Sequence, residues 1–172
     1  MSAARTYVVA LPAFSDHDRE IIDAIRNRFD RLAGAIPPHV TLVFATERLD
    51  ASGLAAHAST SMATAPFTCV LRRTHVEHDP FNDEHCVFLV VDEGARQIVE
   101  LHDALYSGPL APELRTDLPY LPHVTIARCP TSADARQVAA MVGDVRMRAR
   151  IDHVRILVGA SGAFTFADTI AL

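Results

Sequence analysis

Hydrophobic and polar residues follow two different periods along this chain, and the periods change in a regular order. Residues 5–11 (RTYVVAL) are apolar and β-branched, which predicts a strand. From residue 19 to 32 apolar side chains recur at intervals of three and four, which predicts a helix. Residues 39–45 (HVTLVFA) have strand character, the Ala-rich segment 50–63 has helix character, and residues 67–76 have strand character again. The first half therefore has the order strand, helix, strand, helix, strand.

The second half of the chain repeats this order. We expect a strand at 85–92 that pairs with 67–76, a helix at 94–106, a strand at 123–129, a helix at 132–142, one long or two short strands at 145–158, and a last strand at 163–171. A Pro- and Gly-rich segment at 107–122 is long enough to be a functional loop. No linker divides the halves, so we expect one domain, residues 1–172, with two lobes related by a pseudo-twofold axis.

The tetrapeptide Pro-His-Val-Thr occurs twice, at 38–41 and 122–125, each time at the start of an expected strand. Proline is tolerated there, and it stiffens the chain just before each histidine. Side chains at positions i and i+2 of a strand share a face, so His39 lies beside Thr41 and His123 beside Thr125. The apolar residues between and after them point to the other face, which leaves the histidines and threonines for water and substrate.

Two such strands, brought together, would present two imidazoles and two hydroxyls on one surface. Imidazole is well suited to proton transfer near neutral pH, and a pair allows one neutral base and one protonated acid. Threonine hydroxyls donate hydrogen bonds to phosphate oxygens without adding charge. A single His-x-Thr is most often structural, but two copies with matching flanks favour a catalytic role. The set fits in-line displacement at a phosphodiester and needs no metal.

Composition bears on the compartment of the protein. The 172-residue chain is 49% hydrophobic, yet no apolar run reaches the roughly 18 residues that cross a membrane. The N-terminus lacks the long apolar region of a secretory signal. The cysteines, Cys69, Cys86 and Cys129, are far apart and odd in number, which indicates reduced thiols. We therefore expect a cytoplasmic protein with no membrane partner, and we take it to be a monomer.

Charge limits the range of nucleic-acid partners. A net charge of −5 excludes a global basic field for a long duplex. All 16 basic residues are arginines, whose planar forks suit phosphate oxygens, although a GC-rich genome would give the same bias. Arg146, Arg148 and Arg150 alternate along one strand, which favours a solvated outer face over a rail for phosphates.

In its two motifs the chain resembles the two-histidine (2H) phosphoesterase superfamily, and within it the 2'-5' RNA ligase and cyclic phosphodiesterase group. That family carries two H-x-T/S-x motifs, one in each lobe, which the segments 39–42 (HVTL) and 123–126 (HVTI) match. The segment HCVFLVVDEGARQIVELHDAL and the Arg in PHVTIAR also look like the family. The resemblance implies a bilobal α+β fold, with an antiparallel sheet packed by helices in each lobe and an active cleft between the lobes.

The same resemblance implies roles for particular residues. His39 and His123 would be the catalytic acid–base pair, and Thr41 and Thr125 would bind the phosphate, with no metal and no other cofactor. Members act on 2',3'-cyclic phosphates of RNA ends or nucleotides, on ADP-ribose cyclic phosphate, or on 2'-5' linkages. The implied partner is therefore a small cyclic nucleotide or an RNA terminus. RNA-directed members often carry an Arg after the first motif, where this chain has residues 43–45 (VFA), so small cyclic nucleotides stay open.

Arg128 and Tyr120 are further candidates for binding substrate. The family favours Arg128, but strict alternation from His123 places it on the opposite face unless a bulge turns it. Tyr120 precedes the second motif and could stack on a base. Alternation assigns Phe44 to the core.

Two other functions stay open. A non-catalytic nucleotide- or RNA-binding module could keep the same fold. A metallohydrolase could use the histidines that flank the turn between the strands 67–76 and 85–92, although their spacing matches no zinc pattern and a polar hairpin tip explains them; these are His75, His78 and His85.

Overall fold

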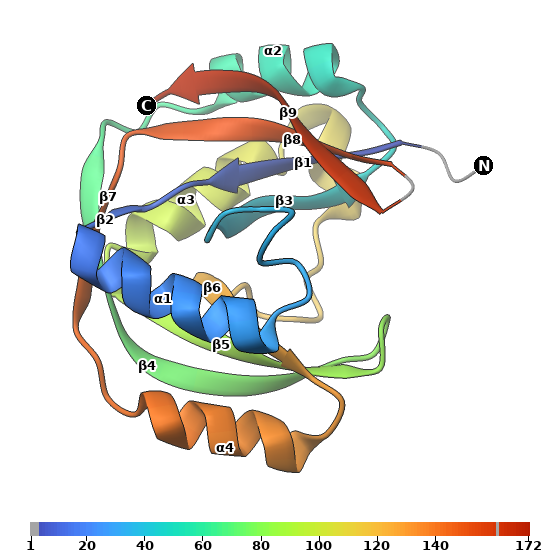
Figure 1. Ribbon diagram of the computed structural model, residues 1–172. Coiled ribbons are helices and arrows are strands. Elements are labelled where there is room, and N and C mark those ends of the chain that lie inside the picture. Colours follow the sequence, from blue (N-terminus) through green and yellow to red (C-terminus); the bar gives the residue numbers. More distant parts are fainter. Residues whose placement is uncertain (1–3, 161) are drawn as a thin grey trace.

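The computed structural model describes residues 4–160 and 162–172, which form two antiparallel sheets that face each other (Figure 1). Sheet A has four strands in the order β3-β1-β8-β9, and sheet B has five in the order β2-β7-β4-β5-β6. Every neighbouring pair of strands is antiparallel. Helices pack on both sheets, so the predicted α+β class is confirmed.

The elements follow the predicted order, with short additions. The strands are β1 (Arg5–Ala10), β2 (Ala13–Phe14), β3 (Val40–Thr46), β4 (Phe67–Asp79), β5 (Glu84–Glu93), β6 (His123–Cys129), β7 (Met147–Ile151), β8 (His153–Ala160) and β9 (Ala163–Ala171). The helices are α1 (Asp16–Phe29), α2 (Ala51–Ser61), α3 (Ala95–Leu105) and α4 (Ser132–Val142), and a 3-10 helix spans Gly108–Glu113 in the long loop. None of the helices within these described ranges is both long and apolar enough to span a membrane.

The two halves of the chain do not form one lobe each. The last strand of the first half, β4, pairs with β5 in sheet B, and β8 from the second half pairs with β1 in sheet A. The segment 145–158 is two strands, β7 in sheet B and β8 in sheet A, and the chain passes between the sheets at Asp152. The pseudo-twofold axis therefore relates β1 to β5, β3 to β6 and β8 to β4. Both motif strands, β3 and β6, are sheet edges.

Two of the helices also pack across the halves of the chain. Helix α2 covers β1, β8 and β9, and α4 covers β4, β5 and β6. Helix α1, which precedes the first motif, packs against β6, whereas α3, which precedes the second, packs against β3. Their buried stripes, such as Ile98, Leu101 and Leu105 of α3, join one main core. Each motif strand is thus supported by the helix that leads to the other motif.

Helix α1 ends at Phe29, directly before Asp30, a residue that contacts the second motif strand. Its first turn is capped by Ser15, whose hydroxyl accepts a hydrogen bond from the backbone N–H of Asp18 at 3.2 Å. Its predicted end at Leu32 is too late, because Asp30 leaves the helix with an extended backbone, φ −120° and ψ 108°. The Asp30 carboxylate then accepts a hydrogen bond from the Leu32 N–H at 3.0 Å. This early end leaves the Asp30 side chain buried beside β6.

Candidate active site

The two edge strands bring the repeated motifs together. His39 directly precedes β3, His123 opens β6, and these two strands contact each other across the gap between the sheets. Thr41 and Thr125 follow two residues later on the same faces as the histidines. The two rings lie close enough for a charge on His39 to lower the pKa of His123. The four residues predicted from the sequence therefore gather in one place.

Both imidazoles are held in the same way. The Nδ1 of His39 lies 2.8 Å from the backbone oxygen of Pro37, and the Nδ1 of His123 lies 2.6 Å from that of Leu121. A carbonyl oxygen can only accept, so Nδ1 carries the proton in each ring. In the neutral state each Nε2 therefore keeps its lone pair and is the nitrogen left for a substrate.

The surroundings favour neutral rings in the free protein. Burial, aided by the charges of Arg26 and Arg128, lowers the pKa of His39 from its usual 6.5 to about 4, although the hydrogen bond to Pro37 and the Asp30 carboxylate oppose this shift. Burial likewise lowers the pKa of His123 to about 4, with further contributions from His39, Arg128 and His75 and opposition from the Leu121 carbonyl. A nearby negative charge, such as a bound phosphate, would favour protonation of either ring and oppose this shift.

A β-bulge follows each motif at the same position. In β6 one extra residue, Ile126, stands between the positions paired with β5, and in β3 the extra residue is Leu42. A bulge shifts the alternation of all later side chains by one. Arg128 is accordingly turned onto the face of His123 and Thr125, which answers the question that strict alternation left open.

The bulge in β3 also moves Phe44 out of the core. Its side chain is 50% exposed, so the assignment to the core was wrong. The error arose because alternation was counted straight through Leu42. Phe44 occupies in the first motif strand the place that Arg128 occupies in the second.

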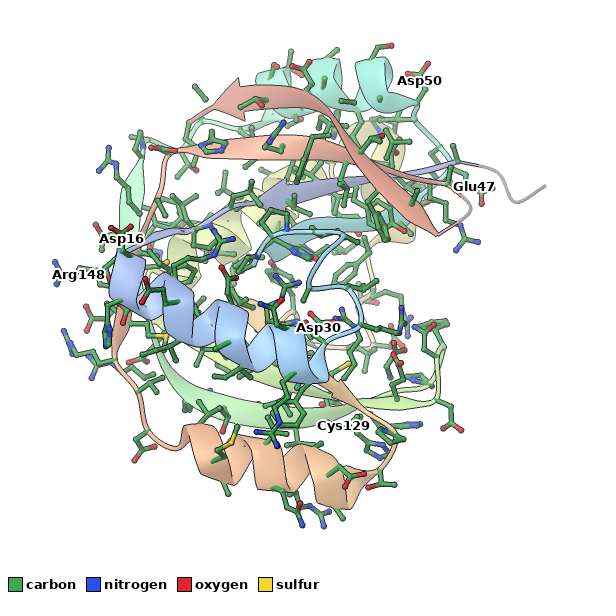
Figure 2. The ribbon with its side chains drawn as sticks, in the orientation of Figure 1. Asp16, Asp30, Glu47, Asp50, Cys129 and Arg148 are labelled. Carbon is green, nitrogen blue, oxygen red and sulfur yellow. The ribbon has the colours of Figure 1, made fainter. Side chains whose placement is uncertain are left out.

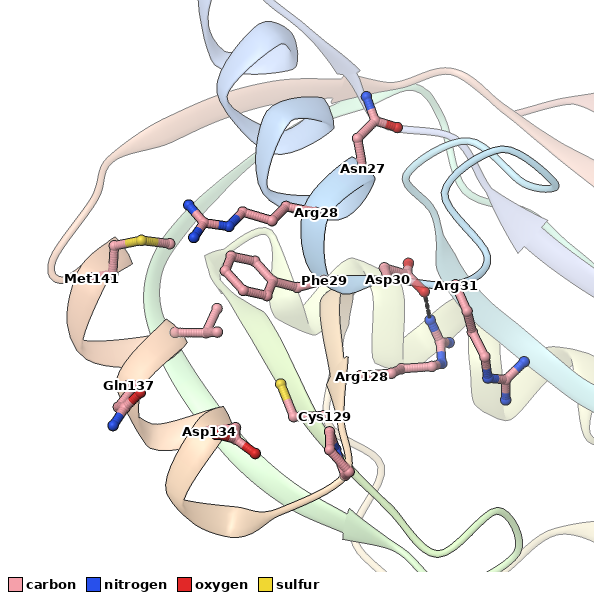
Figure 3. Close-up of a pocket in the computed structure, with 12 residues that line it drawn as sticks. Asn27, Arg28, Phe29, Asp30, Arg31, Arg128, Cys129, Asp134, Gln137 and Met141 are labelled. Carbon is pink, nitrogen blue, oxygen red and sulfur yellow. Dashed lines mark hydrogen bonds and ion pairs between the residues drawn. The ribbon is translucent and has the colours of Figure 1, made fainter.

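A buried ion cluster joins the second motif strand to the first motif loop. The Asp30 carboxylate, labelled in Figure 2, pairs with the Arg128 guanidinium (Figure 3). It also pairs with Arg26 Nε at 3.0 Å, and both Asp30 and Arg26 are almost fully buried. Burial alone would raise the pKa of Asp30, but Arg128, the Leu32 N–H and Arg26 hold that pKa below its usual value. Arg26 Nη2 also donates to the backbone oxygen of Ile36 at 2.8 Å, in the loop that leads to His39.

The opposite side of the site is fastened by neutral rings. Tyr120 donates its hydroxyl to the backbone oxygen of Thr41 at 2.7 Å and stacks on His102 with ring centres 3.7 Å apart. His102 Nδ1 lies 2.8 Å from the Leu42 oxygen, and Tyr106 accepts the Phe44 N–H at 3.1 Å. One face of Tyr120 is therefore covered, and its hydroxyl positions β3. The stacking of a base on Tyr120 stays a prediction, and it would have to use the other face of the ring.

Sequence reasoning missed several of these neighbours. Phe88 stacks on His123 with centroids 3.6 Å apart, and it pairs with Thr125 on one side and with His75 on the other. The burial of Arg26 could have been predicted from the sequence, because Arg26 lies four residues after Ile22 on the apolar stripe of α1. A charged residue on such a stripe is rarely buried without a partner.

The remaining candidates lie apart from the histidine pair or are already paired. His75 bonds to Glu77 at 3.0 Å and His78 to Asp83 at 3.1 Å, while His85 packs on His78. No group of three or more His, Cys, Asp or Glu side chains within residues 4–160 and 162–172 is arranged to hold a metal ion. Strand β7 is separated from β6 by two strands. Arg146, just before β7, and Arg150, within it, are exposed and form ion pairs with acidic neighbours.

A pocket of about 660 Å³ lies next to the second motif strand, and Asp30 and Arg128 are among its lining residues (Figure 3). It lies between the end of α1 and α4, and Phe29, Cys129 and Met141 are among its lining residues. The motif histidines and threonines do not line it. In Figure 3, Arg128 reaches towards Asp30, whereas Cys129, the next residue, lies beside α4.

The sequence of this chain matches a known family. A sequence model of the 2'-5' RNA ligase superfamily matches residues 14–163. The chain belongs to the 2'-5' RNA ligase superfamily. A Bacillus licheniformis protein provisionally named a phosphoesterase is 26% identical over 163 residues, which cover 90% of this chain and 91% of that protein. The family predicted from the two motifs is confirmed, and membership supports an enzyme of the two-histidine phosphoesterase type.

Solved structures share the fold over nearly the whole chain. Escherichia coli LigT in its apo form superposes with a TM-score of 0.63 at 18% identity and covers 98% of this chain and 96% of its own. LigT complexed with 3'-AMP gives 0.62 at 17% identity, with 99% of both chains covered. Kluyveromyces marxianus Usb1 gives 0.60 at 11% identity, with 98% of both covered. At these identities the likeness is one of fold.

Proposed function

We propose that the protein opens 2',3'-cyclic phosphates of RNA ends or small nucleotides by acid–base catalysis between His39 and His123, without a metal. The observation that carries the proposal is the matched tethering of the two imidazoles. Each Nδ1 is held by a carbonyl two residues upstream, so both Nε2 atoms are free to exchange protons. Thr41 and Thr125 stand beside them as hydrogen-bond donors for phosphoryl oxygens.

The charge around the pair suits an anionic substrate. Arg26, Asp30 and Arg128 together carry one net positive charge next to two neutral rings. A cyclic phosphate brings a negative charge into this surrounding, and an opposite charge nearby favours the protonated form of histidine. Substrate binding thereby raises the pKa of the pair, so that one ring can hold the proton that the reaction needs.

In the proposed reaction, one histidine takes a proton from water as its oxygen forms a bond to phosphorus. The other histidine gives a proton to the ribose oxygen as the bond between that oxygen and phosphorus breaks. The products are a phosphomonoester and a free ribose hydroxyl. The same pair serves 2'-5' joining when the 5'-hydroxyl of a second RNA replaces water as the attacking group.

The bound ligands of similar structures support a nucleotide substrate. LigT has been solved with 3'-AMP and with ATP, and Usb1 with uridine monophosphate. These are nucleotides bound to proteins that share this fold. They motivate the choice of nucleotide phosphates over other phosphodiesters as first substrates to test.

The test uses 2',3'-cyclic nucleotides and a short RNA ending in a cyclic phosphate, all in excess EDTA. Products are separated by chromatography and identified by mass. We expect cleavage by the parent and a loss of about a hundredfold or more in both His39→Ala and His123→Ala, the size of an acid–base contribution. His17→Ala, at an exposed position in α1, is the matched control and should leave the rate unchanged.

Each other outcome points to a different function. Binding of cyclic nucleotide in calorimetry without any product would indicate the non-catalytic module. Activity that is lost in EDTA and restored by a divalent ion would indicate the metallohydrolase. Cleavage that survives both histidine substitutions would mean that the repeated motif is structural.

A further inference from the structure

The inner face of sheet A extends from the first motif towards β8 and β9. Thr41 pairs with Val9, and Val9 pairs with Arg155, so these three side chains form one row on the same face. With strands about 4.8 Å apart, Arg155 is rooted about 10 Å from Thr41.

Arg155 forms no ion pair with an acidic side chain among the residues that the structure describes. Its guanidinium carbon lies 3.9 Å from the centre of the Phe166 ring. Its Nε is buried and has no hydrogen-bond partner in the part of the chain that the structure describes. Asp152, the nearest acidic residue in sequence, pairs with Arg150 and His153 instead. Arg128, in contrast, is already paired with Asp30.

Aromatic rings surround this arginine on the same face. Tyr7 and Phe164 meet edge to face with centroids 6.1 Å apart, and the Phe164 ring lies over Gly159. A Cβ at Gly159 would come within 2.9 Å of that ring, so the glycine lets the ring lie flat on the strand. Tyr7, Phe164 and Phe166 are only partly buried. We call Tyr7, Arg155, Phe164 and Phe166 the sheet A patch.

The chemistry of the patch is that of a single-stranded nucleic acid site. Such sites combine a basic group that follows the backbone with aromatic side chains on which bases stack. A guanidinium that lies over an aromatic ring can still donate from its two terminal nitrogens to two phosphate oxygens. The patch also lies on the cleft side of sheet A, in one row with the phosphate-binding threonine of the proposed site.

We propose that the sheet A patch binds the nucleotide next to the reacting one, with Arg155 on the phosphate 5' to the terminal nucleoside. The preferred substrate is then an RNA end that carries a 2',3'-cyclic phosphate, rather than a free cyclic nucleotide. The proposal rests on the proposed function, because it assumes that the cyclic phosphate reacts between His39 and His123. A mononucleotide lacks the second phosphodiester and gains nothing from Arg155.

The test compares two substrates in one variant. We measure kcat/KM for a short RNA ending in a 2',3'-cyclic phosphate and for a 2',3'-cyclic mononucleotide, with Arg155→Gln beside the parent. Because a charge-assisted bidentate contact is lost, we expect kcat/KM for the RNA to fall about tenfold and that for the mononucleotide to stay unchanged. Arg150→Gln, an exposed arginine on β7 and the same change in net charge, should alter neither.

Equal effects on both substrates, or no effect on either, would overturn the proposal. If Arg155→Gln does not fold, as judged by circular dichroism, Arg155→Lys is used with the same criterion, because lysine keeps the charge but loses the fork. If the parent cleaves neither substrate, the proposed function fails, and binding of a labelled RNA with a 3'-phosphate then decides for the patch. Weaker binding by the variant supports the patch, and equal binding rejects it.

Discussion

The two motif strands are held at equivalent positions by different kinds of contact, namely ion pairs at β6 and hydrogen bonds from neutral rings at β3. Asp30 follows the last residue of α1 and holds Arg128 of β6, whereas Tyr106 follows the last residue of α3 and holds the backbone of β3. Four residues earlier stand Arg26 and His102, which hold the loop before His39 and the Leu42 oxygen respectively. One fastening consists of buried charges, and the other consists of neutral rings.

This difference shows how a repeated scaffold can build an asymmetric site. The ionic side leaves one net positive charge beside β6, and the aromatic side adds none. The residue five positions after each motif histidine differs in the same way. It is the cation Arg128 in β6 and the exposed aromatic residue Phe44 in β3. Two identical motifs thus receive different surroundings, which is a condition for one histidine to act as acid and the other as base.

The largest expected effect comes from breaking the ionic side. Asp30→Asn removes the only charge that balances Arg26 and Arg128 in the cluster, and both arginines stay buried or nearly so. Breaking a buried pair by removing one partner typically costs about 3–5 kcal/mol. We expect a loss of this order in the free energy of unfolding, measured by urea denaturation.

The matched control is an aspartate at the surface of the same helix. Asp23 pairs with Arg19 at 2.7 Å with both side chains well exposed, so Asp23→Asn should cost at most about 1 kcal/mol. If Asp30→Asn were as stable as Asp23→Asn, the ion cluster would not hold β6 against α1.

The second prediction concerns the pH dependence of activity. Burial lowers the pKa of both His39 and His123 to about 4, and the acid must be protonated for turnover. Above that pKa the protonated fraction of the free enzyme falls about tenfold per pH unit, so kcat/KM should decrease between about pH 5 and 8. The kcat profile, which reports the complex with the anionic substrate, should lie at higher pH. A kcat/KM optimum above about pH 7 would contradict depressed histidine pKa values.

The same measurement compares Arg128 with the residue at the equivalent place in β3. Arg128 lowers the pKa of both histidines, so Arg128→Gln should move the falling limb of kcat/KM to higher pH. Phe44→Leu, at the equivalent place in β3, carries no charge change and should leave the limb where it is. A limb that stays in place in Arg128→Gln, or that moves equally in Phe44→Leu, would show that the charge of Arg128 does not contribute to the low histidine pKa values.

Local rules predicted the parts of the fold that depend on short segments. The period changes identified the four α-helices and the motif strands. Ser15 and Thr131 cap two of these helices, because each side-chain oxygen accepts a backbone N–H of the first turn. The sequence did not show that β4 joins sheet B and β8 joins sheet A, because a strand has the same alternation of apolar and polar residues in either sheet. Such pairing is decided by contacts between residues distant in the chain.

The same limit applied within the site. The repeated tetrapeptide identified the histidines and threonines, since two copies of a local pattern are visible in one sequence. The bulges at Leu42 and Ile126 are set by pairing with β1 and β5, so the faces of Phe44 and Arg128 could not be counted from the sequence. Asp30 met Arg128 only because α1 packs on the strand of the other motif.

The smallest expected effect comes from breaking the aromatic side. Tyr120→Phe keeps the ring on His102 and removes the hydroxyl that donates to the Thr41 oxygen at 2.7 Å. The loss of one neutral hydrogen bond typically costs about 1 kcal/mol, so this variant should be clearly more stable than Asp30→Asn in the same urea series. Tyr7→Phe makes the same chemical change at a partly exposed ring and is the control. A cost for Tyr120→Phe as large as that for Asp30→Asn would contradict the comparison, because the neutral side would then hold its strand as strongly as the charged side does.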